Sequence, residues 1–276
     1  MSVSISVPGA ARFSVGRVLR DGFGIFGRNF ISFAVIAIGF RLLWLLIPTI
    51  NSALGDALDE GPLDQSNWKG QLVQYVVGLV ISGVAQAAII PGTMQNLRGQ
   101  SASWGDIGRG LSLAPLIVVA GLFAYLPTIL STIIDGVFAD YEFIVGATQI
   151  AMGIVGLFLF VIWWVYAPAL LVDGGGILAA LRRSAYLTKG RRGKIFGLLM
   201  LWGIMVAAPI IAVVIIGGVP AAEAVSTHPS TLAGFAGLIV IGLSTALHAV
   251  LVTVSYYHLR AEKEGIGVEE AAQVFD

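Results

Sequence analysis

The sequence predicts an all-α, polytopic membrane helix bundle with six transmembrane helices and three amphipathic helices on its cytoplasmic side. Two observations carry this prediction. Hydrophobic residues make up 57% of the chain and charged residues only 12%, whereas a soluble domain carries about 25% charged residues because its surface faces water. Six apolar runs are also long enough to cross a hydrocarbon core, which takes roughly 20 residues. These runs are residues 30–50, 71–94, 113–134, 143–171, 195–219 and 232–256.

The distribution of basic residues predicts the orientation of the spans. All 16 Lys and Arg residues except Arg41 and Lys69 lie before the first span, in alternate connections or after the last span. The opposite connections hold acidic residues, namely Asp56, Asp59, Glu60, Asp64, Asp135, Asp140, Glu142 and Glu223. Positive charge in short loops marks the cytoplasmic side of a membrane. We therefore expect both termini in the cytoplasm. The first apolar run is too long for a signal peptide, so we expect no cleavable signal.

Each cytoplasmic stretch before an odd-numbered span has the pattern of a short amphipathic helix. In the first stretch, Val15, Val18 and Phe26 share a helical face that excludes Arg17 and Arg20. The three stretches are residues 13–28, 101–111 and 177–189. We infer one membrane domain of three repeats, each an amphipathic helix plus a transmembrane hairpin. The repeats cover residues 13–98, 101–172 and 176–257. A cytoplasmic tail follows over residues 258–276, with a short helix expected at 268–275. Such repeats are common in transporters, but duplication without transport explains them equally well.

The chain lacks the residue patterns of the common catalytic and cofactor sites. It contains no P-loop, no HExxH motif and no GxSxG motif. It has no cysteine, and its three histidines are too far apart in sequence for metal-ligand spacing. The formal net charge is zero, which gives no indication of nucleic-acid binding. We therefore expect no enzyme activity, no catalytic residues, no cofactor and no metal.

Four polar side chains fall within predicted spans, and charged groups in such places are functional candidates because burying them in lipid is costly. Arg41 lies in the first span, Gln86 in the second, Gln149 in the fourth and His248 in the sixth. Counting the helical rise from the membrane edges, we expect Arg41 to approach Gln149 before Gln86 or His248. No span has a central carboxylate to form a proton relay with His248, so we expect this histidine to be hydrogen-bonded to a neighbouring helix.

The strongest cytoplasmic feature is the basic run that joins the fourth and fifth spans. The positive-inside rule explains such a run without any further function. Beside an amphipathic helix, however, basic residues also suit anionic lipid headgroups, at about 1 kcal/mol each near the surface. The candidate headgroup ligands are Arg182, Arg183, Lys189, Arg191, Arg192 and Lys194.

Three stretches of the chain together resemble a known family. They are FSVGRVLRDGFGIFGRNFISF at 13–33, ALRRSAYLTKGRRGKIFGLL at 180–199, which follows Pro168, Asp173 and Gly174, and YYHLRAEKEG at 256–265. This pattern resembles the membrane domain of the glycerophosphoryl diester phosphodiesterase family, a bacterial module that some members fuse to a soluble catalytic barrel. No segment here is long or soluble enough for that barrel. The resemblance thus implies a fold, a bacterial plasma membrane and a link to phospholipid or glycerophosphodiester handling, and it supplies no catalytic residues.

These observations favour a non-enzymatic, multi-pass protein of the bacterial inner membrane. We expect it to organise or bind membrane lipids, chiefly anionic ones, or a protein partner in the membrane or cytoplasm. One alternative is a transporter or permease component for a small or lipid-like solute, which the repeats and Arg41 would suit. Another is a membrane anchor for a separately encoded enzyme, as the fused members of the resembling family suggest.

Overall fold

The computed structural model describes residues 12–57, 67–100, 103–227 and 232–265, and every regular element in these ranges is helical. The elements are α1 (Val15–Arg28), α2 (Phe30–Leu42), the 3-10 helix η1 (Leu43–Leu46), α3 (Ile47–Ala57), α4 (Trp68–Leu97), α5 (Trp104–Ser112), α6 (Ala114–Val137), α7 (Glu142–Ile162), α8 (Tyr166–Asp173), α9 (Gly176–Thr188), α10 (Arg192–Thr227) and α11 (Leu232–Glu264). The all-α prediction is confirmed for this part of the chain. The helix predicted at 268–275 lies outside the described residues.

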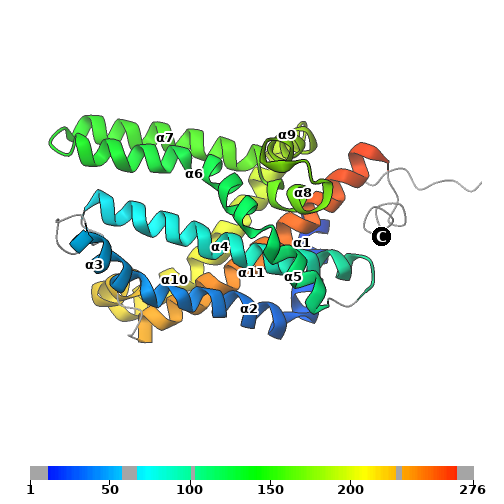
Figure 1. Cartoon of the computed structure of the whole chain (residues 1–276), viewed down its shortest axis with the longest axis horizontal. Helices are drawn as coiled ribbons and strands as arrows, with labels where there is room; N and C mark the ends of the chain where they lie inside the picture. The colour runs from blue at the N-terminus through cyan, green and yellow to red at the C-terminus, as the bar shows by residue number, and fades with distance from the viewer. Residues whose placement is uncertain (1–11, 58–66, 101–102, 228–231, 266–276) are drawn as a thin grey trace, which may run out of the picture.

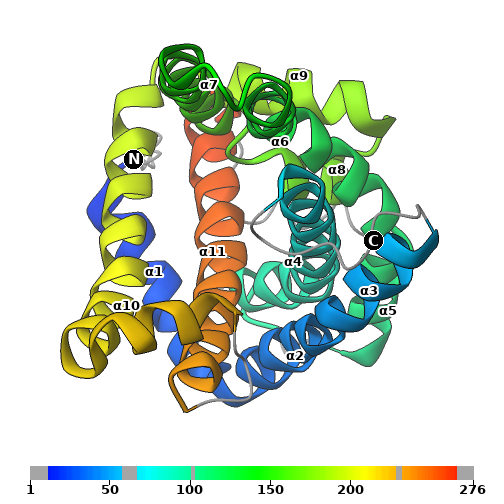
Figure 2. The same cartoon turned by 90° about the vertical axis from the view of Figure 1, so that its left-hand side faces the viewer.

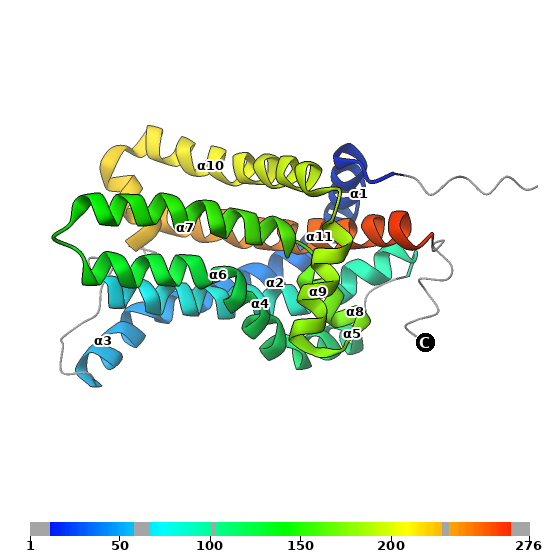
Figure 3. The same cartoon turned by 90° about the horizontal axis from the view of Figure 1, so that it is seen from above.

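The long helices run along the long axis of the molecule, and the short helices α1, α5, α8 and α9 gather at one end of it, whereas α3 lies at the other end (Figure 1). This end, which we call the short-helix end, consists of α1, α5, α8, α9 and the C-terminal part of α11 (Figure 3). The stretches predicted as cytoplasmic helices correspond to α1, α5 and α9, and all lie there. Their common location is the arrangement expected if the connections between spans alternate between two sides of a membrane.

Five helical segments are long and apolar enough to cross a membrane, and six if a bent pair forms one span. The five are Trp68–Leu97, Ala114–Val137, Glu142–Asp173, Arg192–Ile216 and Leu232–Glu264. The bent pair joins α1 to α2 and η1 at an angle of 85°. The predicted first span, residues 30–50, is therefore not one uniform α-helix, because a 3-10 turn at Leu43–Leu46 divides α2 from α3.

The predicted fourth span, residues 143–171, breaks between α7 and α8. Pro168 has no N–H, and its ring excludes the carbonyl four residues earlier, so it interrupts a helix. Ser184 of α9 supplies partners for the freed backbone groups. Its Oγ accepts a hydrogen bond from the Val165 N–H at 3.1 Å and donates to the Ile162 carbonyl at 3.1 Å. Thr188 Oγ1 donates to the same carbonyl at 3.0 Å. Helix α9 thus bonds to two of the backbone groups at this break.

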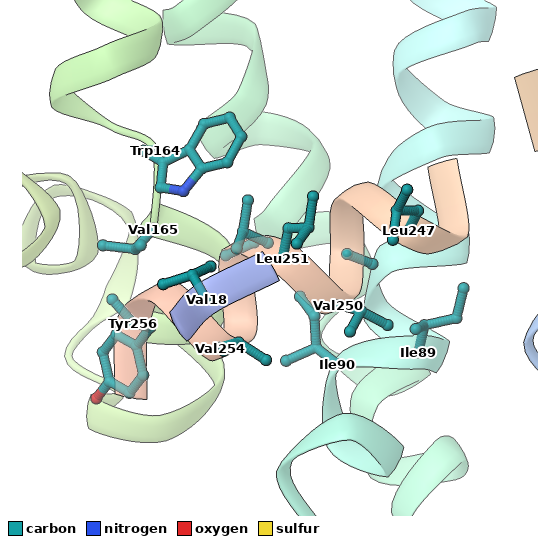
Figure 4. Close-up of a cluster of buried hydrophobic side chains, with 14 of the residues drawn as sticks. Val18, Ile89, Ile90, Trp164, Val165, Leu247, Val250, Leu251, Val254 and Tyr256 are labelled. Atoms are coloured by element: carbon teal, nitrogen blue, oxygen red, sulfur yellow. The ribbon is translucent and has the colours of Figure 1, made fainter. Parts of the chain in front are cut away.

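Helix α11 forms the centre of the bundle (Figure 2). Its buried side chains meet those of α1, α4 and the α7–α8 break, as Figure 4 shows for Leu251, Val18, Ile90 and Trp164. At Gly22 on α1, an added Cβ would lie 2.8 Å from Leu251 Cδ2, so a glycine lets α1 pack closely against α11. Half of the apolar window in α11 is buried, compared with 6% in α10. The outer surface of α10 therefore suits contact with lipid.

Candidate functional site

Some residues of the basic run form ion pairs or hydrogen bonds with other described parts of the chain, and others are exposed. Arg191 forms an ion pair with Glu262 of α11, and its Nε donates to both carboxylate oxygens at 3.0 Å. Arg183 pairs with Glu264 and, at 3.0 Å, with Asp173. Lys194 Nζ donates to the Phe13 carbonyl at 2.7 Å. These contacts join α9 and the start of α10 to α11 and to the residues before α1.

The acidic partners also raise the pKa of these guanidinium groups. Burial alone would lower the pKa of Arg183, but hydrogen bonds to Glu264 and Asp173 outweigh that effect and raise it. The hydrogen bond to Glu262 likewise raises the pKa of Arg191. Of the other predicted headgroup ligands, Arg182 and Lys189 are exposed. Arg192 lies with its Cζ 5.8 Å from the centre of the Phe158 ring. The lipid role of the run stays a prediction.

The predicted approach of Arg41 to Gln149 is wrong. The Arg41 guanidinium lies 4.1 Å from the centre of the Trp44 ring, on its own chain segment. Gln149 Nε2 instead donates to Asp135 Oδ2 at 3.0 Å. Helices α2 and α7 occupy opposite sides of the bundle (Figure 2). The prediction failed because helical rise fixes the depth of a residue but not the side of the bundle on which its helix lies.

His248 and Gln86 do come together, since both line a cavity of about 110 Å³ inside the bundle. The hydrogen bond expected for His248 is not formed at Nε2, which is buried without a partner in the described part of the chain. Aromatic rings surround the imidazole instead. The ring centres of Trp164 and Trp202 lie 5.1 Å from it, and that of Phe160 lies 5.9 Å away.

A second cavity, of about 310 Å³, lies at the short-helix end between α4, α5 and α8. We call it the α5 cavity. Its apolar wall consists of Ile90, Pro91, Met94, Leu113, Leu171 and Val172. Its polar wall consists of Gln95, Arg98, Asp106, Arg109 and Ser112. One cavity thus joins a hydrocarbon-like surface to a polar surface whose two arginines and one aspartate carry a net charge of one positive unit.

Asp106 organises the polar wall of the α5 cavity. It forms a capping box with Ser103, whose Oγ accepts from the Asp106 N–H at 3.2 Å. Gln95 Nε2 and Arg109 Nη2 donate to Asp106 Oδ1 at 3.2 and 2.6 Å. The hydrogen bond from Ser103 is the main reason why the pKa of Asp106 lies well below its usual range, although burial acts in the opposite direction. The carboxylate is therefore ionised and fully engaged, while the Arg109 side chain remains 74% exposed.

Gly110 lies at the contact where α5 packs against α4. A Cβ at this position would lie 1.9 Å from the Ala87 carbonyl oxygen and 2.8 Å from Pro91 Cγ. No side chain fits there, so the close approach of the two helices requires glycine. From the sequence, Arg98 and Arg109 were expected only to mark the cytoplasmic side, and neither Gln95 nor Asp106 was predicted as a site residue. The Ser-x-x-Asp capping pattern at 103–106 and the glycine four residues later were the available signals.

Among the residues that the structure describes, no group of three or more His, Asp or Glu side chains could hold a metal ion. Comparison with known proteins adds no relative, because the chain matches no protein-family model, no curated protein and no solved structure. The resemblance to the glycerophosphoryl diester phosphodiesterase membrane domain therefore stays a prediction. Function has to be inferred from the geometry of the two cavities and of the short-helix end.

Proposed function

We propose that this chain is a non-enzymatic, multi-pass protein of the bacterial inner membrane that binds an anionic lipid in the α5 cavity. The observation that carries the proposal is the composition of that cavity. An apolar wall adjoins a polar wall with two arginines and one aspartate, and both lie at the short-helix end. An anionic lipid likewise joins apolar acyl chains to a charged headgroup.

The proposed topology has six spans, with α2 and η1 contributing to the first and the short-helix end facing the cytoplasm. If α2 crosses the membrane, the 85° bend at Asn29 places α1 close to the membrane plane. Helix α1 buries Val18 and Ile25 toward the protein and exposes Arg20 and Arg28. This division supports an amphipathic helix at the inner leaflet, where basic side chains meet anionic headgroups.

The polar wall favours an anion over a neutral ligand. Asp106 is satisfied by Ser103, Gln95 and Arg109, so its charge is already balanced. A guanidinium has five N–H donors. The exposed guanidinium of Arg109 can therefore bind a phosphate oxygen while it keeps its hydrogen bond to Asp106. Charge-assisted bonds of this kind are the strong ones. The volume, about 310 Å³, fits a headgroup and the first part of an acyl chain.

Transport of a small or lipid-like solute is the second candidate. The observation that favours it is the cavity at His248, which lies inside the bundle and has polar lining residues. An anchoring or scaffolding role would require a protein partner, and it predicts that such a partner co-purifies in fixed proportion.

Native mass spectrometry tests the lipid proposal. The protein is released from nanodiscs that contain equal amounts of phosphatidylglycerol and phosphatidylethanolamine. We expect one phosphatidylglycerol to remain bound to the wild-type chain and to the Arg182→Gln variant, and to be lost from Arg109→Gln. The two variants remove the same charge, but Arg182 does not line the cavity. A bare wild-type chain, or an adduct unchanged by Arg109→Gln, would set the proposal aside.

A further inference from the structure

The cavity at His248 is enclosed mainly by aromatic rings from five helical segments. Its lining includes Tyr125 of α6, Phe160 of α7, Tyr166 of α8, Trp202 of α10 and His248 of α11, with Trp163 and Trp164 from the α7–α8 break. Helix α4 adds Ser82 and Gln86, and Gln86 is buried. None of the lining residues is a lysine, arginine, aspartate or glutamate. The lining therefore combines aromatic rings with neutral polar groups.

Two polar atoms of the lining residues are buried without a hydrogen-bond partner in the part of the chain that the structure describes. They are Trp164 Nε1, which can only donate, and His248 Nε2. Such groups are costly when nothing bonds to them. By contrast, Trp202 Nε1 donates to the Ser244 carbonyl at 3.3 Å. The two unpartnered atoms indicate that the cavity is shaped for a guest that both accepts and donates a hydrogen bond.

We propose that this cavity binds a small organic ammonium ion that carries a hydroxyl group. The alkylammonium lies against the ring faces of Trp202, Phe160 and their neighbours, because a cation is attracted to the face of an aromatic ring and most strongly when water is excluded. The hydroxyl accepts from Trp164 Nε1 and donates to His248 Nε2. The imidazole is then neutral, with its proton on Nδ1.

Other guests fit the lining less well. An anion would find no arginine or lysine in the lining. A metal cation requires a shell of several oxygen ligands, usually with carboxylates among them, and the lining residues that carry a side-chain oxygen, Ser82, Gln86, Tyr125, Tyr166 and Thr245, include no carboxylate. Water satisfies single polar atoms, but it leaves the aromatic enclosure unexplained. The volume, about 110 Å³, exceeds the roughly 10–15 Å³ that one water occupies by the same measure.

The α7–α8 break positions part of this cavity. Trp164 lies between Ile162 and Val165, whose backbone groups bond to Ser184. A continuous helix would carry its indole in another direction, because each residue turns by 100° around a helix axis. The break therefore has a use beyond accommodating Pro168. The site is separate from the α5 cavity, and this inference does not depend on the proposed lipid binding.

Tryptophan fluorescence of the full chain in nanodiscs tests the inference, since Trp163, Trp164 and Trp202 are among the six tryptophans of the protein. Choline chloride is titrated, with sodium chloride at the same ionic strength as the control. We expect a saturable change with choline and none with sodium. Tetramethylammonium lacks the hydroxyl and should bind roughly 5–150-fold more weakly, the range expected for the loss of two net hydrogen bonds.

Variants locate the binding. Trp202→Leu should weaken choline binding at least tenfold, whereas Trp104→Leu should leave it unchanged, because Trp104 is 86% exposed on α5 and does not line the cavity. Ala124→Leu fills the cavity while keeping every ring, and it should also abolish the response; a thermal unfolding curve shows whether each variant is folded. The inference is overturned if choline gives no saturable change, if folded Ala124→Leu responds like the wild type, or if tetramethylammonium binds as tightly as choline.

Discussion

The Ser184 hydroxyl on α9 accepts a hydrogen bond from the Val165 N–H at 3.1 Å, at the break between α7 and α8. The same hydroxyl donates to the Ile162 carbonyl. One side chain of a short helix therefore supplies both a donor and an acceptor to the backbone between α7 and α8. This contact couples the short-helix end to the interior, where Trp164 contacts His248.

Replacing this hydroxyl should destabilise the protein. Ser184→Ala leaves the buried Val165 N–H without a partner, a loss that costs about 1–3 kcal/mol. Thermal unfolding in nanodiscs measures the effect. Ser244→Ala is the matched control, because Ser244 Oγ donates only to the Ile241 carbonyl of its own helix. Equal unfolding temperatures for the two variants would contradict the role given to Ser184.

Substitution by alanine should have opposite effects on α5 at two of its glycines. Gly110→Ala places a Cβ against the Ala87 carbonyl, so α5 must move away from α4 and the α5 cavity must change shape. Gly108→Ala meets no atom within 4 Å and should stabilise the helix by about 0.5–1 kcal/mol. Hydrogen exchange of α5 amides separates the two outcomes. Similar exchange in both variants would show that Gly110 does not seat the helix.

The capping box of α5 should show a defined pH dependence. The folded-state pKa of Asp106 is depressed, chiefly by Ser103, so its stabilisation is present above the ordinary aspartate pKa of about 3.9 and lost as the pH falls toward the lower folded value. Ser103→Ala removes the cap and should cost about 1 kcal/mol at pH 7. The difference between wild type and variant should shrink below about pH 4. A constant difference from pH 7 to pH 3 would contradict this assignment.

The basic run should separate into stabilising and non-stabilising positions. Arg191→Met breaks the ion pair with Glu262 and should lower the unfolding temperature. Arg182→Met removes an exposed guanidinium and should leave it unchanged. If both variants unfold at the wild-type temperature, the contact with Glu262 contributes nothing measurable to stability.

Much of the helical framework could be predicted from hydropathy and charge. Helices α1, α5 and α9 lie where the amphipathic pattern placed them, and the long helices follow the apolar runs. The break at 163–165 could be suspected from Pro168 alone, but its repair by Ser184 depends on a contact between separate segments. The Arg41 and Gln149 pairing failed for the same reason, since no pattern within one helix says which helices are neighbours.

The candidate sites were harder to predict because they depend on how several helices meet. From the sequence, Asp106 and Arg109 look like ordinary polar residues of a short helix. The close packing of Gly110 against Ala87 brings Asp106 and Arg109 beside Gln95 and an apolar wall. His248 stood out as a rare intramembrane histidine, but its aromatic surroundings come from three other segments of the chain.

Photocrosslinking with a lipid tests the central proposal most directly. A phosphatidylglycerol with a photoreactive group near its headgroup is incorporated into nanodiscs with the full chain, and the labelled peptides are identified by mass spectrometry. We expect labelling to concentrate on the end of α4 and on α5, and to fall at least tenfold in Arg109→Gln but not in Arg182→Gln. Labelling spread evenly over the exposed helices, or unchanged in Arg109→Gln, would contradict lipid binding in the α5 cavity.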